Sequence, residues 1–133
     1  MNYWQALATS VWGAGLLLGN VAAFAGDRCN NFDIKIANQT GTTAKVTQVD
    51  YFDFAANQWR TEARIEQVLQ DGVLWEWSRN LEHVGGALSK LRITYKAKLS
   101  GGFNLNPYSA ARTQESATFT CADNGASPTV NLP

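Results

Sequence analysis

Two tryptophans separated by a single residue are the first candidates for ligand contact. Trp75 and Trp77 lie in residues 73–78, a segment rich in strand-forming side chains. Alternate residues of a strand point to one side, so both indoles leave the same face ~7 Å apart. Such a pair can stack on sugar rings or lie at a lipid interface. The alternative is that both indoles pack in the core while Glu76 and Ser78 face solvent. The wider aromatic group is Tyr51, Trp59, Trp75, Trp77, Tyr95 and Tyr108.

Four basic residues share one face of the clearest predicted strand, residues 90–99. Apolar residues alternate with them: Leu91, Ile93, Tyr95, Ala97 and Leu99. The basic residues, called the basic ridge below, are Lys90, Arg92, Lys96 and Lys98. Such a ridge suits phosphates, sulfates or an acidic partner. The alternative is a solvated face on which lysines prevent edge-to-edge pairing and acids of a neighbouring strand pair with the bases.

Catalytic patterns are sparse, and we expect no enzyme, no metal and no cofactor. His83 is the only histidine, and the chain has no G-x-S-x-G elbow, no H-E-x-x-H motif and no glycine-rich phosphate loop. A pair of carboxylates for glycoside hydrolysis needs no motif. Its candidates are Asp50, Asp53, Glu62, Glu66 and Glu76. Asp50 and Asp53 lack the alternating oxygen ligands of a calcium loop.

The first 26 residues carry no charged side chain and differ from the rest of the chain. Residues 6–25 are apolar and end in Ala23-Phe24-Ala25, the small-x-small pattern of signal cleavage. We therefore predict a signal peptide over residues 1–25 and a single domain over residues 26–133. The absence of Lys and Arg from residues 1–5 departs from the usual signal. A retained membrane anchor is the alternative, although three glycines and Asn20 make the span poor.

Export gives the two cysteines a structural meaning. Cys29 and Cys121 lie near the two ends of the predicted domain, and an even pair in an oxidising compartment forms a disulfide. Neither cysteine has the C-x-x-C spacing of a metal site. We predict a secreted or periplasmic protein closed by a Cys29–Cys121 bond. Asn38-Gln39-Thr40 also matches the N-x-T glycosylation acceptor.

The hydrophobic pattern predicts a small antiparallel β-sandwich of seven to nine short strands. Predicted strands cover residues 32–36, 45–54, 59–61, 73–78, 90–99, 115–121 and 129–132, and residues 63–70 favour a strand over a helix. Turns are predicted at residues 71–72, 100–102 and 123–125, with one helical turn over residues 81–84. A closed barrel is the alternative.

These features predict an exported, non-enzymatic binding module for a carbohydrate or a cell-envelope component. Eleven basic and eleven acidic residues give no net charge, which argues against a nucleic-acid partner. One alternative is a membrane-active, haemolysin-like protein that binds anionic lipid through its tryptophans and the basic ridge. A second alternative is a small secreted hydrolase with paired carboxylates. The sequence does not determine the oligomeric state.

Overall fold

The structure, a computed structural model, describes residues 27–101 and 106–133. The predicted signal peptide and part of the predicted turn at residues 100–102 lie outside these ranges. The described residues form strands and no helix, so this part of the chain is all-β. The strands are β1 (Cys29–Asn38), β2 (Ala44–Asp53), β3 (Gln58–Leu69), β4 (Leu74–Leu81), β5 (Leu88–Ser89), β6 (Leu91–Ala97), β7 (Arg112–Glu115), β8 (Phe119–Thr120) and β9 (Val130–Leu132).

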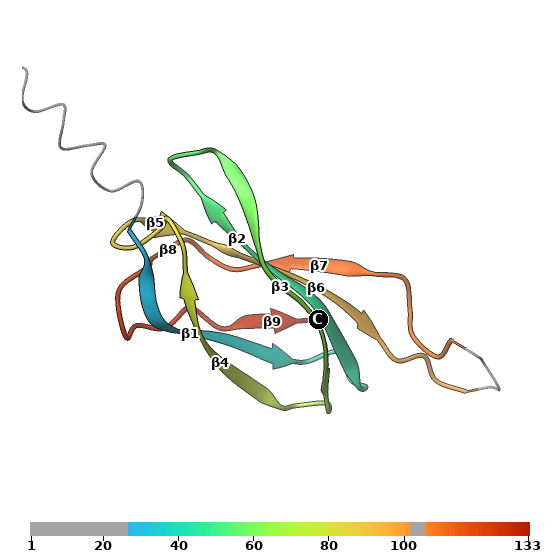
Figure 1. Ribbon diagram of the computed structural model, residues 1–133. Coiled ribbons are helices and arrows are strands. Elements are labelled where there is room, and N and C mark those ends of the chain that lie inside the picture. Colours follow the sequence, from blue (N-terminus) through green and yellow to red (C-terminus); the bar gives the residue numbers. More distant parts are fainter. Residues whose placement is uncertain (1–26, 102–105) are drawn as a thin grey trace, which may run out of the picture.

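The strands form three sheets, which Figure 1 shows from one side. The larger two have the orders β3-β2-β6-β7 and β4-β1-β9, and β5 pairs with β8 in the third. All pairings within the four-stranded sheet are antiparallel. The predicted all-antiparallel arrangement is wrong at one place, because β9 runs parallel to β1 through Ile36–Val130. The C-terminal strand thereby covers the edge of β1 that β4 leaves open.

The two larger sheets share one hydrophobic core. Strand β6 alternates strictly, with Leu91, Ile93 and Tyr95 buried between half-buried polar residues. Strand β1 alternates in the same way from Phe32 onward in the other sheet, and its Phe32 and Ile34 have no exposed surface. Burying each such side chain contributes about 2 kcal/mol, so this alternation fixes which face of each sheet turns inward.

The turn between β3 and β4 transfers the chain from one sheet to the other. Gly72 has φ of +81°, the left-handed conformation that glycine adopts without strain, as the Asp71-Gly72 signal predicts. Strand β3 is the edge of the four-stranded sheet and β4 is the edge of the three-stranded sheet. The ion pair between Arg79 and Glu62 joins these two edge strands at 2.6 Å.

The disulfide joins the start of β1 to the residue after β8. Cys29 and Cys121 are both fully buried, with their Cα atoms 5.9 Å apart and a separation of 92 positions in sequence. The chain packs tightly beside this bond, because a Cβ atom at Gly85 would lie 2.5 Å from the carbonyl oxygen of Arg28. A stable disulfide indicates a non-reducing, extracytoplasmic environment. None of the described residues forms a helix long and apolar enough to cross a membrane.

Two local predictions are wrong. The predicted strand over residues 115–121 is interrupted after Glu115, because the Ser116 hydroxyl accepts a hydrogen bond from Leu91 N at 2.9 Å and donates one to the Ala117 carbonyl. The predicted helical turn at residues 81–84 is absent. Instead β4 continues to Leu81, and His83 takes a left-handed conformation with φ of 70° in an exposed turn.

The N-x-T pattern at Asn38 has a structural explanation. Asn38 is fully buried, and its side-chain amide donates hydrogen bonds to the carbonyl oxygens of Thr42 and Leu69 at 2.8 and 2.9 Å. Its side-chain oxygen accepts from the hydroxyl of Thr40 at 2.7 Å. In the folded domain the amide nitrogen is therefore inaccessible to glycosylation.

Candidate functional site

The basic ridge lies on the side of the four-stranded sheet that faces away from the core, called the outer face below. Arg92 and Lys96 alternate with the buried residues of β6, Lys90 directly precedes the strand, and Lys98 directly follows it. Register with β2 gives each half of the ridge different neighbours. Arg92 lies opposite Asp50, whereas Lys96 lies opposite Lys45.

The first half of the ridge is neutralised by acids. Asp50 is 1% exposed although it points away from the core, and Arg92 donates to its carboxylate from Nε and Nη2 at 3.2 and 3.1 Å. Thr61 Oγ1 and Gln48 Nε2 donate to the other oxygen at 2.9 and 2.8 Å. Lys90 Nζ lies 3.0 Å from Glu115 Oε1. These contacts fix the positions of both cations.

Three aromatic rings lie beside these cations and are called the aromatic platform: Phe52, Phe54 and Trp59. The ring of Phe52 makes edge contacts with the other two, at centroid distances of 4.8 Å to Phe54 and 5.0 Å to Trp59. The Arg92 guanidinium lies 4.2 Å from the centroid of Trp59, and Lys90 Nζ lies 5.3 Å from it. Both distances are typical of cation–π contacts.

The aromatic platform exposes apolar surface to solvent. Phe54 is 45% exposed. The β2–β6 register, extended by three residues, places Leu88 opposite Phe54, and the hydrogen bond from Phe52 N to Lys90 O supports this extension. Leu88 is 53% exposed. This end of the outer face therefore combines exposed apolar side chains with two fixed cations.

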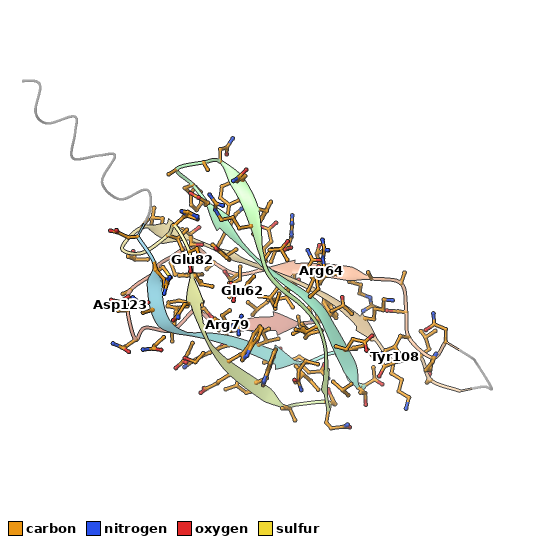
Figure 2. All side chains as sticks on the ribbon, in the orientation of Figure 1. Glu62, Arg64, Arg79, Glu82, Tyr108 and Asp123 are labelled. Carbon is orange, nitrogen blue, oxygen red and sulfur yellow. A yellow bond between two sulfur atoms is a disulfide. The ribbon has the colours of Figure 1, made fainter. Side chains whose placement is uncertain are left out.

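The second half of the ridge has no acidic partner among the described residues. Lys45, Lys96 and Lys98, called the lysine end, take part in none of the ion pairs formed within residues 27–101 and 106–133. Lys45 Nζ lies 4.4 Å from the ring centroid of Tyr108, which Figure 2 labels near the far end of the sheet. Tyr108 itself pairs with Lys98 in an isolated antiparallel bridge.

Trp75 and Trp77 face the core side of β4. Both are half-buried and pack against the core, while Glu76 and Ser78 are exposed. Their rings stack on each other at 5.2 Å, and the Arg79 guanidinium lies 4.5 Å from the centroid of Trp77. Figure 2 shows Arg79 and its partner Glu62 close together at this side of the molecule. Because Trp75 and Arg79 flank Trp77 along the strand, this geometry favours packing over sugar stacking.

Asp50 and Asp53, the two candidate carboxylates on β2, do not face each other. Asp50 points to the outer face, whereas Asp53 points to the inner face, three residues further along β2. Asp53 Oδ2 accepts from Arg60 Nε at 2.8 Å, and Ala56 N donates to Oδ1. Burial alone raises the pKa of Asp53, but the Arg60 and Ala56 hydrogen bonds and the Arg60 charge outweigh it and lower the pKa below its usual value. Within the described residues, no group of three or more His, Cys, Asp or Glu side chains could hold a metal ion.

The two tyrosines of the inner face serve the packing of the domain. Tyr51 donates a hydrogen bond to Glu82 O at 3.0 Å and accepts one from Glu82 N at 3.1 Å. Burial raises the pKa of the Tyr51 hydroxyl despite the opposing effect of the Glu82 hydrogen bond. The Tyr95 hydroxyl donates to Pro133 O at 3.1 Å. Both side chains are almost fully buried and present no surface to a ligand.

Two shallow pockets lie away from the outer face. One of about 600 Å³ lies beside the disulfide, and its lining residues are Asp27, Arg28, Asn30, Gly85, Gly86, Ala122 and Asp123. The other, of about 290 Å³, is lined by Asn31, Ser78, Arg79 and Asn80. Neither includes a residue of the basic ridge or the aromatic platform. The candidate site therefore lies outside both of these pockets.

Sequence reasoning missed Phe52, Phe54 and Lys45. Phe52 and Phe54 have the same one-residue separation as Trp75 and Trp77, so the rule that selected the tryptophans also selects this pair. Lys45 has no such signal, because only strand register brings it to Lys96.

Comparison with protein-family models, with curated proteins and with solved structures gave no match.

Proposed function

We propose that this chain is an exported, non-enzymatic binding module with a β-sandwich fold, and that its ligand is a carbohydrate of the cell envelope. The aromatic platform, together with Lys90 and Arg92, is the contact surface. The disulfide supports a location outside the cytoplasm. The apolar leader with its small-x-small end supports export through a cleaved signal peptide, to the periplasm or beyond the cell.

One observation carries the proposal: three aromatic rings and two fixed cations occupy a sheet face that turns away from the core. Such a face needs only polar side chains for solubility. Aromatic rings offer apolar surface to sugar C–H groups, and a guanidinium or an ammonium group donates hydrogen bonds to sugar oxygens.

Fixed geometry strengthens this interpretation. The Arg92 side chain is held by Asp50 and by the Trp59 ring, and Lys90 is held by Glu115. Immobilising a long side chain costs about 1 kcal/mol on binding, and here that ordering precedes the ligand. The arrangement is therefore suited to recognition.

The test is binding of soluble cell-wall polysaccharides, monitored by tryptophan fluorescence, with two matched truncations. Phe54→Ala removes an exposed ring from the aromatic platform, and Leu74→Ala removes an equally exposed apolar side chain from the other sheet. We expect Phe54→Ala to weaken binding about five-fold, because an aromatic contact contributes on the order of 1 kcal/mol. Leu74→Ala should bind as the unaltered protein does.

Two results would overturn the proposal. Equal affinities of the two variants would remove the aromatic platform from the site. Binding to vesicles with no binding to any polysaccharide would favour the membrane-active alternative. Circular dichroism of each variant checks that the fold is retained.

A further inference from the structure

The lysine end contains an unfavourable pairing that the fold does not relieve. Lys45 lies directly opposite Lys96 in the antiparallel register, and like charges in that position destabilise a sheet. The next neighbour of Lys45 across the sheet is Val68 on β3. Extending the β6–β7 register by one residue places Ala111 beside Lys96 on the other side. Neither neighbour is an acid.

The imbalance extends over the whole outer face. Alternation and register place six basic residues on it: Lys45, Arg64, Lys90, Arg92, Lys96 and Lys98. They place three acidic residues there: Asp50, Glu66 and Glu115. Because the chain has eleven of each sign, this one face carries three excess positive charges and the rest of the chain three excess negative charges. Two of the three acids are already bound to Arg92 and Lys90.

We infer that the ligand is an acidic polysaccharide that lies along the outer face, with its sugar rings on the aromatic platform and its acidic groups at the lysine end. This inference rests on the function proposed above and names the class of ligand. The attraction is electrostatic complementarity between an anionic chain and a face with excess lysine.

The dimensions of the face suit an extended chain. Lys90 and Lys96 are six residues apart along one strand, or roughly 20 Å. Basic residues two positions apart on a strand are separated by ~7 Å. A polymer with regularly spaced acidic groups can occupy the aromatic platform and the lysine end together, whereas a single sugar or a small anion reaches only one of them.

A lipid surface fits this layout less well. Insertion into an anionic bilayer places apolar side chains beside the cations that contact the headgroups. Here Phe54 and Leu88 lie beside Lys90 and Arg92, two cations that are already paired with acids. The unpaired Lys96 and Lys98 lie at the other end of the face, where the smaller Val68 is the exposed apolar side chain beside Lys45. The layout therefore favours a chain along the sheet.

The experiment compares polymers that differ only in charge. Polygalacturonate and its methyl ester share one backbone, and dextran sulfate and dextran share another. The first pair tests carboxylates and the second tests sulfates. Calorimetry at about 0.05 M salt gives the affinities, and anionic phosphatidylglycerol vesicles are measured in parallel.

The protein variants are matched in charge. Lys96→Gln with Lys98→Gln removes two charges from the lysine end. Arg28→Gln with Lys35→Gln removes two charges elsewhere, from residues in exposed or half-exposed ion pairs with Glu82 and Glu76. We expect the first variant to lose about ten-fold in affinity for the acidic polymer, as removal of two exposed charge contacts implies, and the second to lose less than about two-fold.

The possible outcomes separate the two proposals. Tighter binding of an acidic polymer than of its neutral partner, lost selectively in the Lys96/Lys98 variant, supports the inference. Equal binding of both polymers that depends on Phe54 overturns the inference and leaves the proposed function standing. Equal losses in the two charge variants also overturn it, since the attraction then reflects only net charge. Absence of polysaccharide binding, or preference for vesicles, overturns both.

Discussion

The two halves of the basic ridge share one strand and one face, yet their surroundings differ. Arg92 has Asp50 opposite it on β2 and Glu115 opposite it on β7. Lys96 has a lysine opposite it on β2. Lys90 and Arg92, the first half, form ion pairs beside the aromatic platform. Lys96 and Lys98, the second half, have no acidic partner among the described residues. The two halves differ in the residues that lie opposite them on β2 and β7.

This difference shows what a basic strand face can become. Where acids lie opposite, the cations are held in place and contribute to the fold. Where they do not, the cations remain available to an external anion. The basic ridge therefore contains two cations that form ion pairs within the fold and two lysines that form none among the described residues.

The largest expected effect comes from breaking the neutralised half at Asp50. Asp50→Ala leaves Arg92, Thr61 and Gln48 without the carboxylate to which they donate. Asp50 is buried but Arg92 is 30% exposed, so the loss is that of the hydrogen bonds to a charged group, and we expect about 2 kcal/mol less free energy of unfolding. Urea unfolding monitored by tryptophan fluorescence gives the value.

The matching change at the lysine end is Lys96→Ala, which should alter the free energy of unfolding by less than about 0.5 kcal/mol. If Asp50→Ala and Lys96→Ala prove equally mild, the two halves do not differ energetically, and the comparison fails.

A smaller effect is expected from acid titration of Asp53, which lies below the aromatic platform on the inner side of β2. Its pKa is lowered in the folded protein, so its contribution is fully present above the ordinary pKa of about 4 and is lost as the pH falls through the lowered value. Asp53→Asn should cost about 1.5 kcal/mol at pH 7, because it weakens a charge-assisted bond to Arg60.

Urea unfolding of both proteins from pH 7 to about pH 2 checks the sign of this effect. The difference between the unaltered protein and Asp53→Asn should shrink below about pH 4. A difference that stays constant over this range would mean that the Asp53 carboxylate does not titrate with folding.

Much of the fold follows from local patterns in the sequence. Five alternations in residues 90–99 predict the buried and half-buried sides of β6, and Asp71-Gly72 predicts the turn with Gly72 in a left-handed conformation. The disulfide follows from the cysteine count and the leader. The alternation and the turn signal depend on residues that are close in sequence. The disulfide needs no such signal, because two cysteines allow only one pairing.

The features that escaped prediction depend on residues far apart in sequence. Asp50 and Arg92 are 42 residues apart, and no periodicity connects them. The parallel pairing of β9 with β1 likewise has no local signal. By sequence, residues 63–70 fit both a helix and a strand. Their pairing with β2 makes residues 63–69 part of strand β3. The candidate site is assembled from such pairings, so the sequence predicted the four cations of the basic ridge but neither their partners nor Lys45.

The smallest expected effect is a gain in stability at the lysine end. Lys96→Gln removes one of two like charges that face each other across β2 and β6. Relief of that repulsion should raise the free energy of unfolding by about 0.3 kcal/mol at low salt. Replicate urea unfolding curves at about 0.02 M salt resolve the change as a shift of the unfolding midpoint. Both proteins should have the same dependence of the unfolding free energy on urea concentration.

Salt identifies the cause of this gain. Repulsion between these half-buried lysines is screened over roughly 3 Å at 1 M salt, so the gain should largely disappear there, while a gain from altered packing would persist. Lys35→Gln is the control, because Lys35 has Glu76 beside it at 3.7 Å and should lose a little stability instead. If Lys96→Gln is more stable and also binds an acidic polymer more weakly, Lys96 contributes to ligand binding at a cost in the free energy of unfolding. A destabilised variant would mean that Lys96 has a structural partner, and the distinction between the two halves of the ridge would disappear.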